Sequence, residues 1–289
     1  MLSTEQRSTE HGAPDYTPVS GADADTPRQQ QQQQPTIQRQ TADLTPDMYN
    51  RLAVEFERRM REDRRKSFGC ATLIALAGFL LSLSPLACDL MGWRGAGGFG
   101  AASIGTFFFQ GGVMMIIGAV LEWVLGNSFF AVVFATYGGF WLSYAATLNP
   151  SFAAFASYAA PDAKSPAEGL ASPAFQSSLA FWLLFMGFIT FIFFICSLAM
   201  SVVFMVLFLS LTITFLLLVG ALFALSNDPV GNMRVANRCI VGAGSSLFVT
   251  AMSGWYVFAS ILFAILGFPI KLPLLEIPHR KKGGDDIEG

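Results

Sequence analysis

The sequence predicts an all-α membrane protein, a bundle of six transmembrane helices preceded by a basic amphipathic helix and a disordered N-terminal tail. Hydrophobic residues make up 53% of the 289-residue chain and charged residues only 13%, whereas about a quarter of a soluble domain is charged. Most of the charges also gather at the two ends, before residue 67 and after residue 270. We therefore expect one membrane domain over residues 67–270, with polar segments on either side.

The first 43 residues (1–43) form the polar N-terminal tail. They are rich in Thr, Pro, Gln and Ser, include a glutamine run over residues 29–34, and contain few large apolar side chains. Such a composition buries too little apolar surface to offset the entropy lost on ordering, so we expect this tail to be disordered. It also lacks the apolar stretch of a cleaved signal peptide, which leaves membrane insertion to the first transmembrane helix.

A basic amphipathic helix is predicted over residues 44–66. Thr45 and Pro46 are the residue types of an N-cap and a first helical position. Apolar side chains then recur every four residues, as on one helix face, at Met48, Leu52, Phe56 and Met60. Basic residues cover much of the remaining surface: Arg51, Arg58, Arg59, Arg61, Arg64, Arg65 and Lys66. This helix either lies on anionic lipid headgroups of the cytoplasmic leaflet or is a solvated segment that only sets topology.

Six stretches reach the length of about 20 mostly apolar residues that a helix needs to cross the hydrocarbon core. They cover approximately residues 68–87, 100–122, 129–148, 178–199, 202–225 and 239–266. The connections after the second and fourth stretches are very short. Each of these two helices is therefore expected to pair with the next one as an antiparallel hairpin.

The distribution of Lys and Arg predicts that both termini are cytoplasmic, because basic residues are enriched in cytoplasmic segments. Basic side chains precede the first stretch over residues 51–66, and others follow the sixth at Lys271, Arg280, Lys281 and Lys282. An even number of spans agrees with this placement, although Arg234 and Arg238 in the last external loop weaken the contrast. Residues 271–289 then form a cytoplasmic C-terminal tail.

Several classes of function are disfavoured by the residues present. A net charge of −2 supplies no basic face for nucleic acid. The four cysteines show no CxxC spacing and the two histidines lie far out in the tails, so we predict neither a metal site nor another cofactor. No motif of a known catalytic site is present, such as GxSxG, HExxH or a P-loop, and we do not expect an enzyme.

The third, fourth and fifth stretches contain no Asp, Glu, Lys, Arg or His. A pathway through the bundle must then be lined by neutral groups, whose hydroxyls and amides can donate to a carboxylate without adding fixed charge. The candidate pore-lining residues are Gln110, Thr136, Thr190 and Thr212. The competing interpretation is hydrogen bonding between helices, which is common for polar side chains in membranes.

Glu122 is an acidic residue at the end of the second stretch, beside Trp123. Either an anchor at the level of the headgroups or a place in a pore vestibule accounts for it. The anchor is the simpler interpretation, because the residue stands at the boundary of the span.

The start of the third stretch carries a specific motif. Residues 126–129 read Gly-Asn-Ser-Phe, and residues 135–143 read Ala-Thr-Tyr-Gly-Gly-Phe-Trp-Leu-Ser. In this motif the chain resembles the acetate uptake transporter family, the six-span YaaH-type acetate and succinate permeases of bacteria and fungi. The motif residues that carry the resemblance are Gly126, Asn127, Gly138, Phe140 and Trp141, with Glu122 just upstream. The polar tail with its glutamine run is similar to that of a fungal member.

The resemblance implies a homohexamer in which each protomer has its own pore for small monocarboxylates, usually in the plasma membrane. It also implies a hydrophobic constriction, which the matching motifs place at Leu73, Tyr137 and Leu211. Leu73 stands where the family commonly has Phe. The opening of the pore departs from the family too, since residues 64–69 read Arg-Arg-Lys-Ser-Phe-Gly instead of Asn-Pro-Ala-Pro-Leu-Gly. Met115 stands where the family has Gln.

These observations lead to one principal hypothesis and three alternatives. We expect passive or proton-linked passage of a small monocarboxylate such as acetate, or also succinate, because a protonated acid crosses a dry constriction at lower cost than an anion. Export of ammonium or ammonia needs the same neutral pore. A non-transporting regulator or scaffold would bind cytosolic partners through the basic helix and the tail. A packed bundle with no open path is the remaining alternative.

Overall fold

The computed structural model describes residues 45–67 and 69–275 of the chain. The tail predicted over residues 1–43 lies outside the described residues. So do residues 276–289, which make up most of the predicted C-terminal segment.

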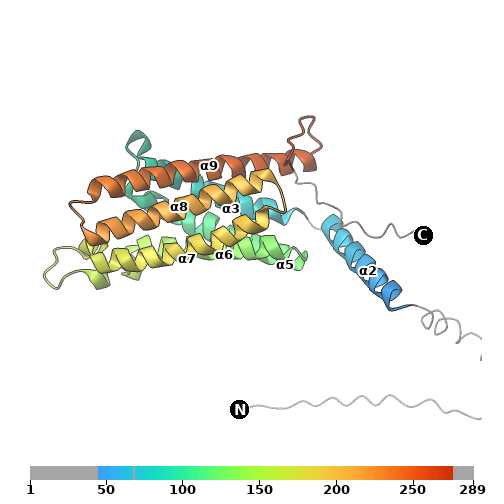
Figure 1. Cartoon of the computed structure of the whole chain (residues 1–289), viewed down its shortest axis with the longest axis horizontal. Coiled ribbons are helices and arrows are strands. Elements are labelled where there is room, and N and C mark those ends of the chain that lie inside the picture. The colour runs from blue at the N-terminus through green and yellow to red at the C-terminus, as the bar shows by residue number, and fades with distance from the viewer. Residues whose placement is uncertain (1–44, 68, 276–289) are drawn as a thin grey trace, which may run out of the picture. The chain divides into compact units, whose positions relative to one another are not determined.

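Helix α2, Pro46–Ser67, occupies most of the range predicted for the basic amphipathic helix (Figure 1). The backbone N–H of Met48 donates to the hydroxyl oxygen of Thr45, with an N to Oγ1 distance of 3.3 Å. Thr45 thereby satisfies one of the donors that every helix start leaves without a partner in the helix. Met48, Leu52 and Phe56 expose their side chains.

The remaining helices are long and apolar enough to cross a membrane six times, which confirms the predicted number of spans. The first, third, fourth, fifth and sixth spans are single helices: α3 Ala71–Met91, α6 Ser128–Leu148, α7 Pro173–Ser197, α8 Val202–Asn227 and α9 Met233–Ile265. The protein is therefore a multi-pass membrane protein. The fourth span begins at Pro173, five residues before the predicted start, because Ser172 and Pro173 supply an extended N-cap position and a proline at the first helical position.

The second span is assembled from short pieces. It consists of the 3-10 helix η2 (Gly98–Ser103), the turn α4 (Ile104–Thr106), the π-helix η3 (Phe107–Met114) and helix α5 (Met115–Val124). A π-helix widens the backbone and is found most often at functional sites. The glycine pair within η3 lies against other spans: a side chain at Gly111 would meet the ring of Trp141, and one at Gly112 would meet Leu142.

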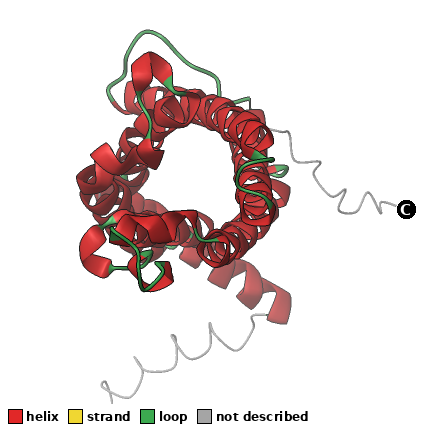
Figure 2. Ribbon diagram, turned by 90° about the vertical axis from the view of Figure 1, so that its left-hand side faces the viewer, coloured by secondary structure: helices red, strands yellow, loops and turns green. Residues whose placement is uncertain are grey.

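The six spans form a ring about a common axis, as the view along the bundle shows (Figure 2). Close backbone contacts run from α7 to α8, from α8 to α9, from α9 to α3, and from α3 through the second span to α6. The ring closes between α6 and α7 mainly through side chains. There the rings of Phe140 and Trp182 stack with centroids 5.2 Å apart, and Tyr137 hydrogen-bonds Thr190.

The outer face of α7 is covered with large apolar side chains. Its exposed residues include Phe181, Phe185, Phe188, Phe191, Ile192 and Ile195. Exposed apolar side chains in such a row are expected where lipid, not water, surrounds a helix.

Glycines set how closely α3 approaches the second span. A Cβ atom at Gly78 would lie 2.2 Å from the backbone oxygen of Gln110, and one at Gly118 would lie 2.6 Å from the Cβ of Ala75. Because lipid gives no hydrophobic drive for helices to associate, this close packing is a main source of attraction between them.

We expect Gly78→Ala to destabilise the bundle by about 2–3 kcal/mol, since the added methyl group overlaps a backbone atom that cannot move without shifting η3. The free energy of unfolding in detergent micelles measures the effect. Gly220→Ala on α8 is the matched control, because a Cβ there meets nothing within 4 Å. Equal stability of the two variants would show that the Gly78 contact is not close in the protein.

Candidate functional site

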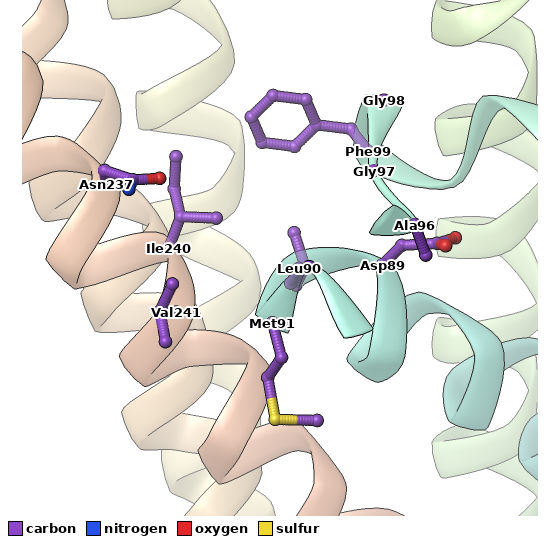
Figure 3. Close-up of a pocket in the computed structure, with 11 residues that line it drawn as sticks. Asp89, Leu90, Met91, Ala96, Gly97, Gly98, Phe99, Asn237, Ile240 and Val241 are labelled. Atoms are coloured by element: carbon purple, nitrogen blue, oxygen red, sulfur yellow. The ribbon is translucent and has the colours of Figure 1, made fainter. Parts of the chain in front are cut away.

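A groove opens at the end of the bundle where α3 and the following turn face α9. It has a volume of about 320 Å³ and includes Asp89, Phe99, Asn237 and Ile240 in its lining. Figure 3 shows the ring of Phe99 extending towards the α9 side, whereas the carboxylate of Asp89 points away from Asn237. The ring of Phe99 therefore gives the groove an apolar surface.

Phe99 adopts an unusual backbone conformation within this groove. Its φ of 54° lies in the left-handed region, between Gly98 at 69° and Gly100 at 80°, and a non-glycine residue there costs roughly 1–2 kcal/mol. The hydroxyl of Tyr144 on α6 donates to the carbonyl oxygen of Phe99 at 2.7 Å, and a side chain at Gly100 would collide with the ring of Phe107. The hydrogen bond from α6 and the close packing at Gly100 thus hold Phe99 in place.

An apolar chamber of about 330 Å³ lies next to this groove. Phe99 and Ile240 line both spaces, as do Leu90 and Gly98. No Asp, Glu, Lys, Arg or His is among the described residues that line the chamber. Its polar side chains are Tyr144, Thr147 and Gln176.

A third, much smaller cavity of about 30 Å³ adjoins the chamber through Leu86, Phe140 and Leu218, which line both. Tyr137 and Leu211 are part of its wall. A space of this size holds about one water molecule. The small cavity therefore has the smallest volume of the three described spaces.

Tyr137 is held in a fixed position beside the small cavity. Its hydroxyl lies 2.9 Å from the Oγ1 atom of Thr190 on α7. Thr190 in turn donates to the carbonyl oxygen of Met186 at 2.6 Å, so the tyrosine must be the donor in the first bond. The ring packs against Phe79 and Phe193, with centroids 5.9 and 6.1 Å away.

The structure brings together two of the three residues predicted for the constriction. Tyr137 and Leu211 line the small cavity, and the α3 residues in its wall are Phe79, Leu83 and Leu86; Leu73 is not among them. Leu73 stands in the first turn of α3 and is half-buried. The sequence did contain a signal, since Gly78 is followed by an aromatic residue and the small glycine lets α3 approach the second span.

The four predicted pore-lining residues differ in their surroundings. Thr190 bonds Tyr137, whereas buried Thr212 donates to the carbonyl oxygen of Phe208 in its own helix at 2.8 Å. Gln110 and Thr136 are half-buried and line neither the chamber nor the small cavity. Thr212 thus hydrogen-bonds within its own helix. Thr214, two residues later, lines the small cavity.

Glu122 is buried, with 3% of its surface exposed. The hydroxyl of Thr72 at the start of α3 donates to one carboxylate oxygen, and the side-chain amide of Asn127 donates to the other at 2.8 Å. The turn between α5 and α6 that makes this possible passes through Gly126 at a φ of 75°. Glu122 therefore joins three spans inside the protein, whereas the neighbouring Trp123 is exposed, at 71%.

Three other motif residues make close packing contacts within the bundle. Gly138 packs closely on Ile116, and Phe140 lines both the chamber and the small cavity. Trp141 stacks on Phe107 with centroids 4.9 Å apart. The Nε1 atom of Trp141 is one of two buried side-chain polar atoms in the described part of the chain that have no hydrogen-bond partner, and the other is Oε1 of Gln176.

Comparisons with known proteins agree with this architecture. A sequence model of the GPR1/FUN34/yaaH family matches residues 54–279. Protein alcS of Aspergillus fumigatus is 40% identical over 209 residues, which cover 72% of this chain and 75% of that protein. Acetate transporter protein patA of Aspergillus clavatus is 29% identical over 194 residues, 67% of this chain and 73% of that protein. The solved structure of the bacterial acetate channel SatP matches with a TM-score of 0.55 at 23% identity, and covers 72% of this chain and 99% of that one.

Proposed function

Because the chain belongs to the GPR1/FUN34/yaaH family, we propose that it is a membrane transporter or channel for small monocarboxylates such as acetate. A relative named as an acetate transporter and a fold shared with an acetate channel support this assignment. Succinate is a second candidate substrate.

The chamber and the small cavity, which no charged side chain of the described residues lines, carry the proposal. The groove, the chamber and the small cavity share lining residues in turn, and Phe79, Tyr137 and Leu211 are part of the wall of the small cavity. We propose that these three residues form the constriction. No basic side chain lines the chamber or the small cavity, so a carboxylate would lose its hydration there without a compensating charge. The undissociated acid carries no charge and so avoids this loss of hydration free energy. If this form passes, each acid carries a proton with it, and transport is passive or proton-linked.

Uptake of labelled acetate into liposomes that contain the full chain is expected to be faster at pH 5 than at pH 7. A simple carboxylic acid titrates near the value for Glu, about 4.3, so this change raises its undissociated fraction by roughly two orders of magnitude. Protein-free liposomes at each pH give the background of direct permeation. Uptake no faster than this background at either pH would overturn the proposal, and competition by methylammonium would point to an amine pathway instead.

We further propose the arrangement of the protein in its membrane. The basic residues before α3 and after α9 support a cytoplasmic location of both termini, and the plasma membrane is the expected membrane. The exposed apolar residues of α2 suit a helix that lies on anionic lipid headgroups. The hexamer remains a prediction from the resemblance. The mass of the detergent-purified protein tests this oligomeric state.

A further inference from the structure

Gln176 is the one chamber-lining side chain that carries a buried polar atom without a partner in the described part of the chain. It lies in the first turn of α7, and 9% of its surface is exposed. The two other polar side chains of the chamber already donate their hydroxyl protons. Tyr144 donates to the carbonyl oxygen of Phe99 at 2.7 Å, and Thr147 to that of Ser143 at 2.9 Å.

The orientation of the Gln176 amide follows from its neighbour. Its Nε2 atom donates to the carbonyl oxygen of Leu170 at 3.3 Å. A backbone carbonyl can only accept, so the nitrogen must face Leu170 and the unpaired atom is the oxygen Oε1. A buried amide oxygen without a donor is unfavourable, and this cost disappears when a ligand supplies an O–H or N–H group.

The chemistry of Oε1 distinguishes the two forms of a carboxylic acid. A carboxylate has acceptors only and would place its oxygens against another acceptor. An undissociated acid carries an O–H that can donate to Oε1, while its carbonyl oxygen can accept from the second hydrogen of Nε2. Most of the remaining wall of the chamber is made of apolar side chains such as Leu179, Leu183 and Leu222, which suit an alkyl chain.

We infer that Gln176 is the recognition residue of the chamber, and that its carboxamide binds the undissociated carboxyl group of a short aliphatic monocarboxylic acid. The role of this contact in transport rests on the proposed function. Binding of the acid in the chamber does not depend on it. Selection of the neutral acid would then occur before the constriction is reached. The size of the chamber, about 330 Å³, leaves room for acids with longer alkyl chains than acetate.

Two ligands of similar size distinguish recognition of the carboxyl O–H group from non-specific partitioning into an apolar space. Butanoic acid at pH 4 offers an O–H, whereas methyl propanoate has the same heavy-atom count and carbonyl but no donor. We expect the full-chain protein in detergent to bind butanoic acid at least tenfold more tightly than the ester, as measured by equilibrium dialysis with labelled ligands. In Gln176→Met, which keeps the side-chain length, this preference is expected to fall to less than threefold.

The controls make each outcome decisive. Ser178→Ala changes an exposed residue two positions along the same helix and is expected to retain the preference. Gln176→Leu serves if Gln176→Met does not fold, as judged by its thermal unfolding profile. A preference for the acid that survives in the folded Gln176 variants would overturn the inference, because the acid would then be recognised without the carboxamide. Acid binding by the unaltered protein without acetate uptake into liposomes would instead leave the inference standing and reject the proposed function.

Discussion

Acetate uptake is expected to fall to the background of protein-free liposomes when Leu211 is replaced by tryptophan. Leu211 lines a cavity of only about 30 Å³ together with Phe79 and Tyr137, so an indole ring at this position fills the space that a solute must cross. We expect a loss of at least about tenfold in initial rate, which corresponds to a rise of about 1.4 kcal/mol in the barrier. Uptake of labelled acetate at pH 5 is the measurement.

Two other substitutions decide whether this loss reflects the constriction. Leu209→Trp places the same ring on an exposed position of α8 and is expected to leave uptake unchanged. Leu211→Ala enlarges the cavity and is expected to raise the rate several-fold, with weaker selection between acetate and larger acids. If Leu211→Trp retained full uptake while folded, the pathway would not pass between Tyr137 and Leu211. Leu211→Phe supplies a smaller obstruction if overpacking by tryptophan prevents folding.

Glu122→Ala is expected to cause the largest loss of stability, about 2–4 kcal/mol. The substitution removes an acceptor from two half-buried donors, the hydroxyl of Thr72 and the side-chain amide of Asn127. It thereby disconnects the start of α3 from the turn between α5 and α6. Equilibrium unfolding in mixed micelles gives the free energy difference from the unaltered protein.

Glu122→Gln is the matched control for this effect. The glutamine oxygen can accept from Asn127, and the Thr72 hydroxyl can rotate to accept from the new amide. We therefore expect a loss below about 1 kcal/mol for this variant. A double-mutant cycle between Glu122→Ala and Thr72→Val should show coupling, and strict additivity would contradict a direct bond between the two side chains.

The seam between α6 and α7 is the place in the ring where two neighbouring helices can separate with the least loss of packing. The contacts there are made by side chains, with Phe140 stacked on Trp182 and Tyr137 bonded to Thr190. Tyr137 belongs both to this seam and to the small cavity. Any movement that parts α6 from α7 therefore changes the constriction as well.

The sequence by itself determined the number of spans, the helix start at Thr45 and Pro46, and the family. These properties depend on local features, namely the length of an apolar stretch, the residue types at a helix start and a contiguous motif. Span ends were less certain because capping residues such as Ser172 and Pro173 extend a helix beyond its apolar stretch. Tyr137 was predicted for the constriction because it stands inside the matching motif, and it lines the small cavity.

Only the tertiary structure decided which side chains meet. It places Phe79 at the cavity instead of Leu73, because the packing of α3 on the second span at Gly78 sets which turn of α3 faces Tyr137. It also shows Glu122 buried between spans and Gln176 in the wall of the chamber. Hydropathy reports how apolar a segment is, but the rotation and relative height of neighbouring helices depend on contacts between residues far apart in sequence. For that reason the spans followed from the sequence, and the residues of the site required the fold.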